Sequence, residues 1–349
     1  MDNHASPQGQ RFVVIGCGSI GKRHMKNLRA LGAREILGCD MRADRRAEVE
    51  ALLGIETVER LDDAWTREPD AIVIATPTAL HLPLALDAAE RGVHLFIEKP
   101  LANTWDGVER LIALARQKEL VSLVGCNMRF HPGLLMVKRL LGEQAIGRIV
   151  AARVEVGQYL PDWHPWEDYR QSYSARAALG GGVILDAIHE IDYIHWLLGD
   201  VEGVFCLAGK MSCLEIDTED TAALLLRFKN GAIGEVHLDY IQRAYSRTCH
   251  LVGEEGTIHW DFTAGQVRWY SARNENWHCF NNPAGWDTNE MYLDEMRHFI
   301  DCLARRAAPE QELLDGARLL AIALTAKASA HKLRWIEMGS QSWNTEATS

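Results

Sequence analysis

A glycine motif that directly follows a short apolar run limits the folds open to this chain more than any other feature. Residues 11–15 have the pattern of a buried strand, and a helical pattern begins near Met25. Glycines between a strand and a helix permit a tight turn and the close approach of a pyrophosphate, to which the helix N-terminus offers free N–H groups. We therefore predict a dinucleotide site at this turn. The residues predicted to form it are Gly16, Gly18, Ser19, Ile20 and Gly21.

The second predicted strand, residues 35–39, ends on Asp40, 22 residues after the second glycine of the motif. A carboxylate at this place can accept hydrogen bonds from a ribose diol and repels a 2′-phosphate. A helix cap or turn residue is the alternative interpretation. Because Arg42, Arg45 and Arg46 lie close by and could tolerate a 2′-phosphate, we expect NAD as the cofactor and keep NADP as the alternative.

The rest of the first half alternates between apolar runs and helical patterns. Apolar runs cover residues 71–75, 93–97 and 121–125, and helical patterns cover residues 81–91 and 104–118. Strands that alternate with helices form a parallel sheet with helices on both faces. The sequence therefore predicts an α/β fold with a doubly wound parallel sheet at its N-terminus.

Two short segments fall at the carboxyl ends of these strands, where open α/β sheets bind ligands. The first holds Thr76, Pro77 and His81, which could line the cofactor cleft or form a plain turn with a solvated histidine. In the second, Glu98-Lys99-Pro100, the proline stops the strand and leaves the lysine at its end. A surface lysine is the alternative there, but beside the glycine motif we predict that Glu98 and Lys99 face the cofactor.

The second half contains an aromatic-rich stretch, residues 157–179, in which charged residues are interleaved. Aromatic rings can stack on a sugar while nearby polar atoms bind its hydroxyls. We therefore expect Trp163 and Tyr173 to contact a substrate. Packing on the same domain or on another subunit is an equally good interpretation.

A triple glycine then opens a helical pattern, residues 183–198, that carries several titratable side chains. At helical spacing Asp186, His189 and Tyr193 share a face, and Asp192 lies one turn beyond His189. A carboxylate beside a histidine suits acid–base chemistry near neutral pH, although an isolated histidine is more often packed or solvated. Tyr193 is a further candidate for contact with the substrate. The spacing does not fit a zinc motif, and we predict no metal.

Four motifs occur in order and at suitable spacing along the first half. They are Gly16 to Gly21, Ala75-Thr76-Pro77 with His81, Glu98-Lys99-Pro100, and Gly125-Cys126-Asn127-Met128-Arg129-Phe130. With the triple glycine, aspartate and histidine of the second half, the set resembles the Gfo/Idh/MocA family (glucose–fructose oxidoreductase / inositol dehydrogenase-like) from about residue 11 to 335.

The resemblance implies an NAD(P)-binding Rossmann domain at residues 10–128. It implies a substrate and oligomerisation α/β domain with a large open, mostly antiparallel sheet at residues 129–335, whose last helix, about 315–332, packs back on the first domain. It also implies a cis Lys99–Pro100 bond and a lysine that faces nicotinamide and substrate. The family commonly places the histidine four residues after the aspartate. Here the spacing is three, so Asp186 could reach the substrate or only position His189.

The activity implied is that of an NAD(P)-dependent oxidoreductase acting on a secondary alcohol of a sugar, sugar derivative, nucleotide sugar or cyclitol. His189 would take the hydroxyl proton, and Lys99 would bind the reacting oxygen. Asp186 would orient the histidine or hold a neighbouring hydroxyl, and Arg129 would contact the substrate or form an ion pair. Two alternatives are an enzyme that uses tightly bound NAD transiently for glycoside cleavage or elimination, and a non-catalytic ligand sensor.

Composition and charge limit the partners and the cellular compartment that we expect for this protein. The net charge of −11, with no block of like charges, argues against nucleic acid and anionic membranes as partners. No apolar stretch approaches the roughly 20 residues of a membrane span, and the first ten residues lack the pattern of a secretory signal. Eight scattered cysteines read as reduced thiols, so we expect a cytoplasmic protein. An open sheet face predicts a homodimer or homotetramer.

Overall fold

The computed structural model describes residues 9–163, 165–305 and 307–339, which form two compact units. The first unit contains the described residues up to 127 together with 287–317, and the second contains 128–286 and those from 318 on. Residues 287–317 thus belong to the first unit, although they lie far beyond the predicted boundary near residue 128. No helix in the described ranges is long and apolar enough to cross a membrane.

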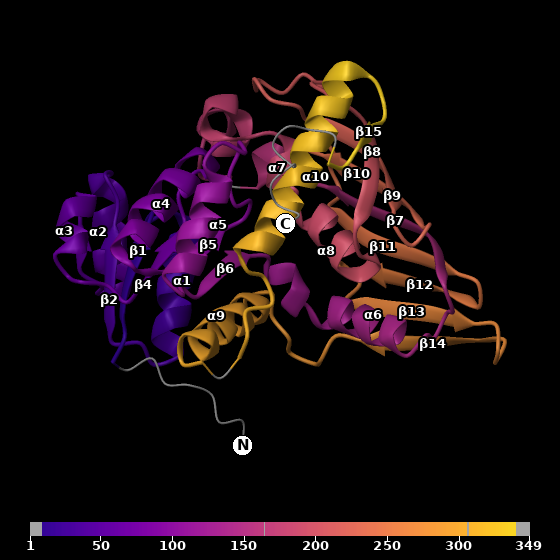
Figure 1. The fold of residues 1–349 in the computed structure, drawn as a ribbon, viewed down its shortest axis with the longest axis horizontal. Coiled ribbons are helices and arrows are strands. Elements are labelled where there is room, and N and C mark those ends of the chain that lie inside the picture. The colour runs from indigo at the N-terminus through magenta and orange to yellow at the C-terminus, as the bar shows by residue number, and fades with distance from the viewer. Residues whose placement is uncertain (1–8, 164, 306, 340–349) are drawn as a thin grey trace. The chain divides into compact units, whose positions relative to one another are not determined.

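The first unit is built on a six-stranded parallel sheet with the order β3-β2-β1-β4-β5-β6 (Figure 1). Its strands are β1 (Arg11–Ile15), β2 (Glu35–Cys39), β3 (Thr57–Val58), β4 (Ala71–Ile74), β5 (His94–Glu98) and β6 (Ser122–Gly125). Its helices are α1 (Ser19–Ala30), α2 (Ala43–Leu53), α3 (Leu61–Trp65), α4 (His81–Arg91), α5 (Val108–Gln117) and α9 (Asn289–Leu303). This architecture confirms the predicted doubly wound sheet. The strand order reverses between β1 and β4, which is where such sheets bind ligands.

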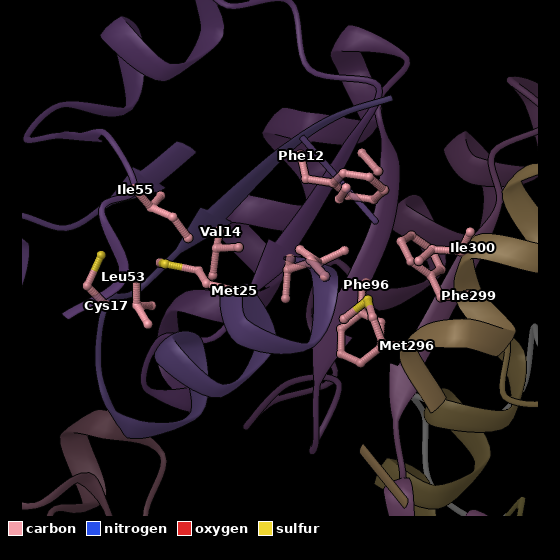
Figure 2. Packing of buried hydrophobic residues seen from close by; sticks show 14 of the residues in the cluster. Phe12, Val14, Cys17, Met25, Leu53, Ile55, Phe96, Met296, Phe299 and Ile300 are labelled. Atoms are coloured by element: carbon pink, nitrogen blue, oxygen red, sulfur yellow. The ribbon is translucent and has the colours of Figure 1, made fainter. Parts of the chain in front are cut away.

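The core of this unit packs residues of its sheet and helices against α9, which lies far along the chain (Figure 2). Strand residues Phe12 and Phe96 are buried beside Met296 and Phe299 of α9. The rings of Phe96 and Phe299 meet edge to face with their centroids 5.5 Å apart. Burial of each such side chain contributes roughly 1.5–3 kcal/mol. Helix α9 is therefore a structural part of the sheet's packing, despite its distance in sequence.

The second unit holds a nine-stranded sheet with the order β14-β13-β12-β11-β7-β10-β9-β8-β15. Its strands are β7 (Ile149–Gly157), β8 (Val201–Gly209), β9 (Thr221–Phe228), β10 (Ile233–Asp239), β11 (Ser246–Gly253), β12 (Gly256–Asp261), β13 (Gln266–Ser271), β14 (Asn276–Asn281) and β15 (Ile336–Glu337). The β7–β10 pair is parallel and the other pairs are antiparallel, which confirms the predicted open, mostly antiparallel sheet. Burial alternates along β9, so one face of the sheet is buried and the other is open.

Helices α6 (Pro132–Gly142), α7 (Val183–Asp186) and α8 (His189–Leu198) belong to the second unit, and α8 packs on β7 and β10 (Figure 1). The single helix expected over residues 183–198 is wrong, because the backbone leaves the helical region at Ala187 with ψ of 33°. Asp186 therefore ends one helix and His189 begins the next. Helix α10 (Leu313–Lys332) runs from the first unit into the second, where Lys327 pairs with Glu219 at 2.9 Å.

Candidate functional site

The glycine turn after β1 is too tight for side chains at two of its positions. A Cβ on Gly16 would lie 2.5 Å from the carbonyl oxygen of Ala75, and one on Gly21 would lie 1.8 Å from that of Gly16. Gly16 also has φ of +100°, which favours glycine. Helix α1 begins at Ser19 without a side-chain cap from Gly18, so its first N–H groups remain available. The turn can thus receive a phosphate against bare backbone.

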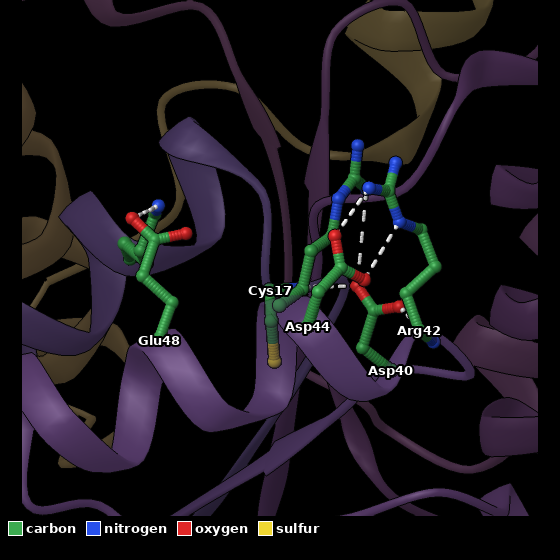
Figure 3. Close-up of polar contacts among 7 residues, drawn as sticks. Cys17, Asp40, Arg42, Asp44 and Glu48 are labelled. Carbon is green, nitrogen blue, oxygen red and sulfur yellow. Dashed lines mark hydrogen bonds and ion pairs between the residues drawn. The ribbon is translucent and has the colours of Figure 1, made fainter.

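Asp40 lies at the carboxyl end of β2 and faces the glycine turn (Figure 3). Its Oδ2 accepts the Cys17 N–H and its Oδ1 accepts the Arg42 N–H, each at 2.8 Å. Asp40 therefore acts as a turn residue, which was the alternative interpretation of its sequence position. Each of its carboxylate oxygens also retains a lone pair that could accept a hydrogen bond from a ribose hydroxyl. The Asp40 carboxylate also faces Arg45, whose Nη1 lies 3.9 Å from Oδ2.

The other two arginines near Asp40 have acidic partners of their own. Arg42 bonds to Asp44, and this hydrogen-bonded guanidinium lowers the pKa of Asp44 to about 2. Arg46 pairs with Glu59 at 3.1 Å. Arg46 also donates from Nη1 to the Asp40 carbonyl at 2.8 Å, and Arg45 lies beside Gly18, so two guanidinium groups place positive charge at the end of β2.

Thr76, Pro77 and His81 form the turn between β4 and α4. The hydroxyl of Thr76 is buried without a hydrogen-bond partner among the described residues, and Pro77 precedes a short 3-10 turn. His81 is only 1% exposed. Its Nδ1 lies 2.7 Å from the Pro100 carbonyl oxygen and its Nε2 lies 2.9 Å from that of Thr76. His81 therefore joins two backbone turns, whereas the sequence suggested contact with the cofactor or exposure to solvent.

Glu98 ends β5 and Lys99 follows it, at the same sheet edge as the glycine turn, because β1, β4 and β5 are parallel and in register. The Lys99–Pro100 bond is cis. Glu98 is 8% exposed, and its Oε1 lies 2.6 Å from Nε2 of His24, while its Oε2 accepts the Lys99 N–H at 3.3 Å. Burial by itself raises the pKa of Glu98, but the hydrogen bond and charge of His24, with the charge of Lys99, give a net lowering.

The triple glycine of the second unit, residues 180–182, lies in close contact with the backbone of Tyr173 and Ser174. A Cβ on Gly181 would lie 2.2 Å from the carbonyl oxygen of Tyr173, and one on Gly182 would lie 2.5 Å from a carboxylate oxygen of Glu219. Gly182 also has φ of +107°. The bare backbone brings Tyr173 and Ser174 beside the helix α7 that follows, and this close approach requires glycine.

Asp186 ends α7 and is surrounded by hydroxyl groups. It accepts hydrogen bonds from Tyr173, from Ser174 Oγ at 2.6 Å and from Tyr240 at 3.0 Å, and it is 4% exposed. Burial and the nearby Asp186 raise the pKa of Tyr240 well above its ordinary value, so this phenol remains a donor. The ring of Trp163 lies edge-on to that of Tyr240 with a centroid distance of 5.4 Å.

Trp163, Tyr173 and Asp186 were all predicted as site residues, and they lie together: Tyr173 bonds to Asp186, and Trp163 contacts Tyr240, which also bonds to Asp186. Ser174 and Tyr240 were not predicted. Tyr240 follows directly after the alternating strand β10, but only the register of that strand shows that its side chain points to Asp186. Tyr173 is half-buried, whereas Ser174, Tyr240 and Asp186 are buried, so it is the most exposed residue of these four.

Helical spacing suggested that Asp192 would pair with His189, but its carboxylate pairs with another residue. It accepts a forked set of hydrogen bonds from Arg129, with Nη2 at 2.6 Å and Nε at 3.1 and 3.2 Å from its two oxygens. The two side chains are 7% and 1% exposed. Arg129 therefore forms the ion pair that was one of its two expected roles, and breaking such a buried pair typically costs about 3–5 kcal/mol. His189 is 8% exposed and begins α8.

Tyr193 is completely buried, so its position favours packing over contact with a substrate. Its ring meets Trp260 edge to face with a centroid distance of 5.7 Å. Its hydroxyl lies 3.5 Å from both Glu190 and the Thr248 carbonyl, beside the 2.8 Å ion pair of Glu190 and Arg247. The break at Ala187 turns this face of α8 toward the sheet. No group of three or more metal-ligating side chains occurs in the part of the chain that the structure describes.

Comparison with known proteins gives two family matches, one for each half of the chain. Residues 10–126 match the oxidoreductase family with an NAD-binding Rossmann fold, and residues 134–259 match the GFO/IDH/MocA C-terminal domain. Myo-inositol 2-dehydrogenase of Thermotoga maritima is 28% identical over 343 residues, which are 94% of this chain and 98% of that protein. An inositol 2-dehydrogenase/D-chiro-inositol 3-dehydrogenase of Shouchella clausii is 30% identical over 259 residues, 71% of each chain.

The fold is also found in a solved structure. Levoglucosan dehydrogenase in complex with NADH and levoglucosan superposes with a TM-score of 0.85 at 23% identity, and the match covers 95% of this chain and 100% of that one. The similarity extends over both units, and the family matches fall on the glycine turn, the lysine turn and the Asp186 region described above. On this evidence the chain belongs to the Gfo/Idh/MocA family of oxidoreductases, with an NAD-binding Rossmann fold in its first half.

Proposed function

We propose that this protein is an NAD-dependent dehydrogenase that acts on a secondary alcohol of a sugar, sugar derivative, nucleotide sugar or cyclitol. The observation that carries the proposal is the placement of Lys99 at the sheet edge that also holds the glycine turn and Asp40. Relatives that are dehydrogenases of inositols support the substrate class.

The residues of the first unit fit a dinucleotide. The bare turn from Gly16 to Gly21 would hold the pyrophosphate, and Asp40 would bind the adenosine ribose. Thr76, Pro77, Glu98 and Lys99 would line the nicotinamide side, where the buried hydroxyl of Thr76 has spare hydrogen-bonding capacity. Bound NAD would supply the hydride acceptor or donor.

The protein's own groups would handle the proton and the charge on oxygen. In the oxidation direction His189 would accept the hydroxyl proton, and Lys99 would donate a hydrogen bond to the reacting oxygen and stabilise its growing negative charge. Asp186 already accepts three hydroxyl hydrogen bonds, which favours a role in positioning over direct contact with substrate. Trp163 and Tyr173, beside it, would contact the sugar ring.

The proposal is tested by thermal shifts with the four nicotinamide dinucleotides, followed by a sugar and cyclitol panel with the preferred one. A ligand that binds only the folded state raises its apparent stability. We expect a shift with NAD⁺ or NADH, a second shift with one class of polyol, and NADH formation with that class. If the protein carries no dinucleotide and none shifts it, the proposal fails. Cofactor retained through purification, with product formed but no net NADH, would point to transient oxidation in glycoside cleavage.

The preference for NAD over NADP should depend on the charge of Asp40. Asp40→Asn keeps an acceptor for the Cys17 N–H but removes the charge that repels a 2′-phosphate, and Arg45 remains nearby. We expect the ratio of kcat/KM for NAD⁺ to that for NADP⁺ to fall by about 10-fold or more. Asp62→Asn, on α3 where the carboxylate pairs with the exposed Arg60, is the matched control and should leave the ratio unchanged. An unchanged ratio in Asp40→Asn would show that this carboxylate does not select the cofactor.

We further infer that a second copy of the chain covers the open face of the nine-stranded sheet. Leu207, Leu225 and Ile233 are 52%, 47% and 55% exposed on the adjacent strands β8, β9 and β10. Ion pairs such as Arg153–Glu235 lie on the same sheet, so both charge signs are available for a two-fold interface. Sedimentation should give a dimer or tetramer, and Leu225→Glu with Ile233→Glu should yield smaller species. A monomeric wild type would refute the inference.

All eight cysteines of the chain are free thiols. Six are buried, and burial raises the pKa of Cys17 and Cys206 to about 12, which keeps them protonated and unreactive. Unpaired cysteines in this number suit a reducing compartment, so we assign the protein to the cytoplasm.

A further inference from the structure

Two buried histidines bind the residues on either side of Lys99. His24 bonds to the side chain of Glu98, and His81 bonds to the backbone carbonyl of Pro100. We propose that His24 and His81 are positioning residues that clamp the Glu98-Lys99-Pro100 turn and so hold Lys99 in one orientation. The inference rests on the proposed role of Lys99 in the dehydrogenase reaction.

His24 holds the clamp on the side of Glu98. It lies on α1 with 0% exposure, and its ring meets Phe96 edge to face with a centroid distance of 4.9 Å, so the imidazole has little freedom to move. Its Nε2 lies 2.6 Å from one oxygen of Glu98, and the other oxygen accepts the Lys99 N–H. A buried carboxylate requires such donors. The carboxylate therefore transmits the position of His24 to the backbone of Lys99.

His81 holds the clamp on the side of Pro100. It is the first residue of α4, and its 2.7 Å contact to the Pro100 carbonyl is the shorter of its two carbonyl contacts. Burial is the largest effect on the pKa of His81 and lowers it, and Lys99 acts in the same direction, while the two carbonyls and Glu98 oppose it. A neutral ring has one N–H and a charged ring has two, so both forms can make the bond to Pro100.

Lys99 lies just beyond the end of β5, so its backbone belongs to a turn and not to the strand ladder. Displacing a catalytic group by about 1 Å can cost about 100-fold in rate. A clamp on both neighbours limits the backbone to one position. Its removal should therefore lower kcat and leave the affinity for NADH nearly unchanged.

The test uses the geometry of the two amide side chains. The nitrogen of asparagine can stand where His Nδ1 stood, and that of glutamine where His Nε2 stood. At position 81 the bond to Pro100 uses Nδ1, so His81→Asn should keep kcat within about threefold of wild type, and His81→Gln should lose about 10- to 100-fold. At position 24 the bond uses Nε2, so the order reverses, and His24→Gln should be active while His24→Asn is not.

His94 supplies the matched control, because it begins the same strand and its Nδ1 accepts the Val121 N–H at 3.0 Å, far from the lysine turn. Both amides at position 94 should leave kcat unchanged. The inference is overturned if the two amides at position 24, and also those at 81, give equal kcat. It is also overturned if His94 variants with the same loss in Tm lose as much kcat as the variants at positions 24 and 81. If substitutions at the fully buried position 24 prevent folding, the comparison of kcat between His81→Asn and His81→Gln decides whether the inference holds.

A second measurement separates this inference from the proposed function. The rate at which an amine-specific reagent modifies Lys99, followed by peptide mass spectrometry, needs no turnover. His81→Gln and His24→Asn should change that rate by more than about threefold, whereas His81→Asn and His24→Gln should not. If the wild type oxidises no polyol, the proposed function fails while this rate pattern still tests the clamp. Equal rates in all four variants would refute the clamp whatever the activity.

Discussion

Lys99→Met is expected to lower kcat/KM for the polyol substrate by about 10²–10³-fold, the usual loss when one donor to a developing oxyanion is removed. Methionine keeps an unbranched side chain of similar length, and Lys99 is half-buried at a strand end, so the fold should persist. The affinity for NADH should remain within about threefold of wild type, because the pyrophosphate and ribose are held elsewhere. Steady-state kinetics and NADH fluorescence titration measure the two effects.

Lys118→Met is the control for the loss of a lysine from the same unit. Lys118 caps the end of α5 and bonds to the Glu90 carbonyl, away from the sheet edge that carries the glycine turn. It should leave kcat/KM unchanged. Lys99→Met with more than about a third of wild-type activity would remove Lys99 from the proposed mechanism.

His189→Gln is expected to have the second large effect, a loss of about 10²–10⁴-fold in kcat, as is typical when a general base is removed. Wild-type oxidation should fall toward acid pH, because a protonated imidazole cannot accept the hydroxyl proton. In the variant this fall in rate toward acid pH, the acid limb of the profile, should disappear. A purely structural defect would lower the rate at every pH and keep the acid limb. The pH profile of kcat/KM is therefore the deciding measurement.

His195→Gln serves as the control on the same helix. His195 lies in the last turn of α8, where it faces Asp200 at 3.9 Å. Its replacement should preserve both the rate and the acid limb. If His189→Gln keeps the acid limb, another group accepts the proton, and Asp186 with its three hydroxyl donors would be the next candidate.

Local sequence determined the elements that form the cofactor half of the site. Strands β1 and β2 begin and end at the predicted residues, because their apolar runs stop at Gly16 and Asp40, and α4 ends as predicted before Gly92, which adopts φ of +81°. Helix α5 begins at Val108, four residues later than predicted, since Gly107 adopts φ of +92° before it. Parallel strands of known order then bring Gly16, Thr76 and Lys99 to one edge without further information.

Tertiary structure decided which partner each buried polar group has. Asp192 bonds to Arg129, 63 residues away, and Asp186 bonds to Tyr240, 54 residues away. Helical spacing predicted that Asp192 would lie beside His189, because the helical period relates only residues about one turn apart. The same limit hid the break at Ala187 and the entry of α9 into the first core. Strand and helix periods are set by neighbouring residues, whereas the partner of a buried carboxylate is set by whichever donor the packing of distant elements brings within reach.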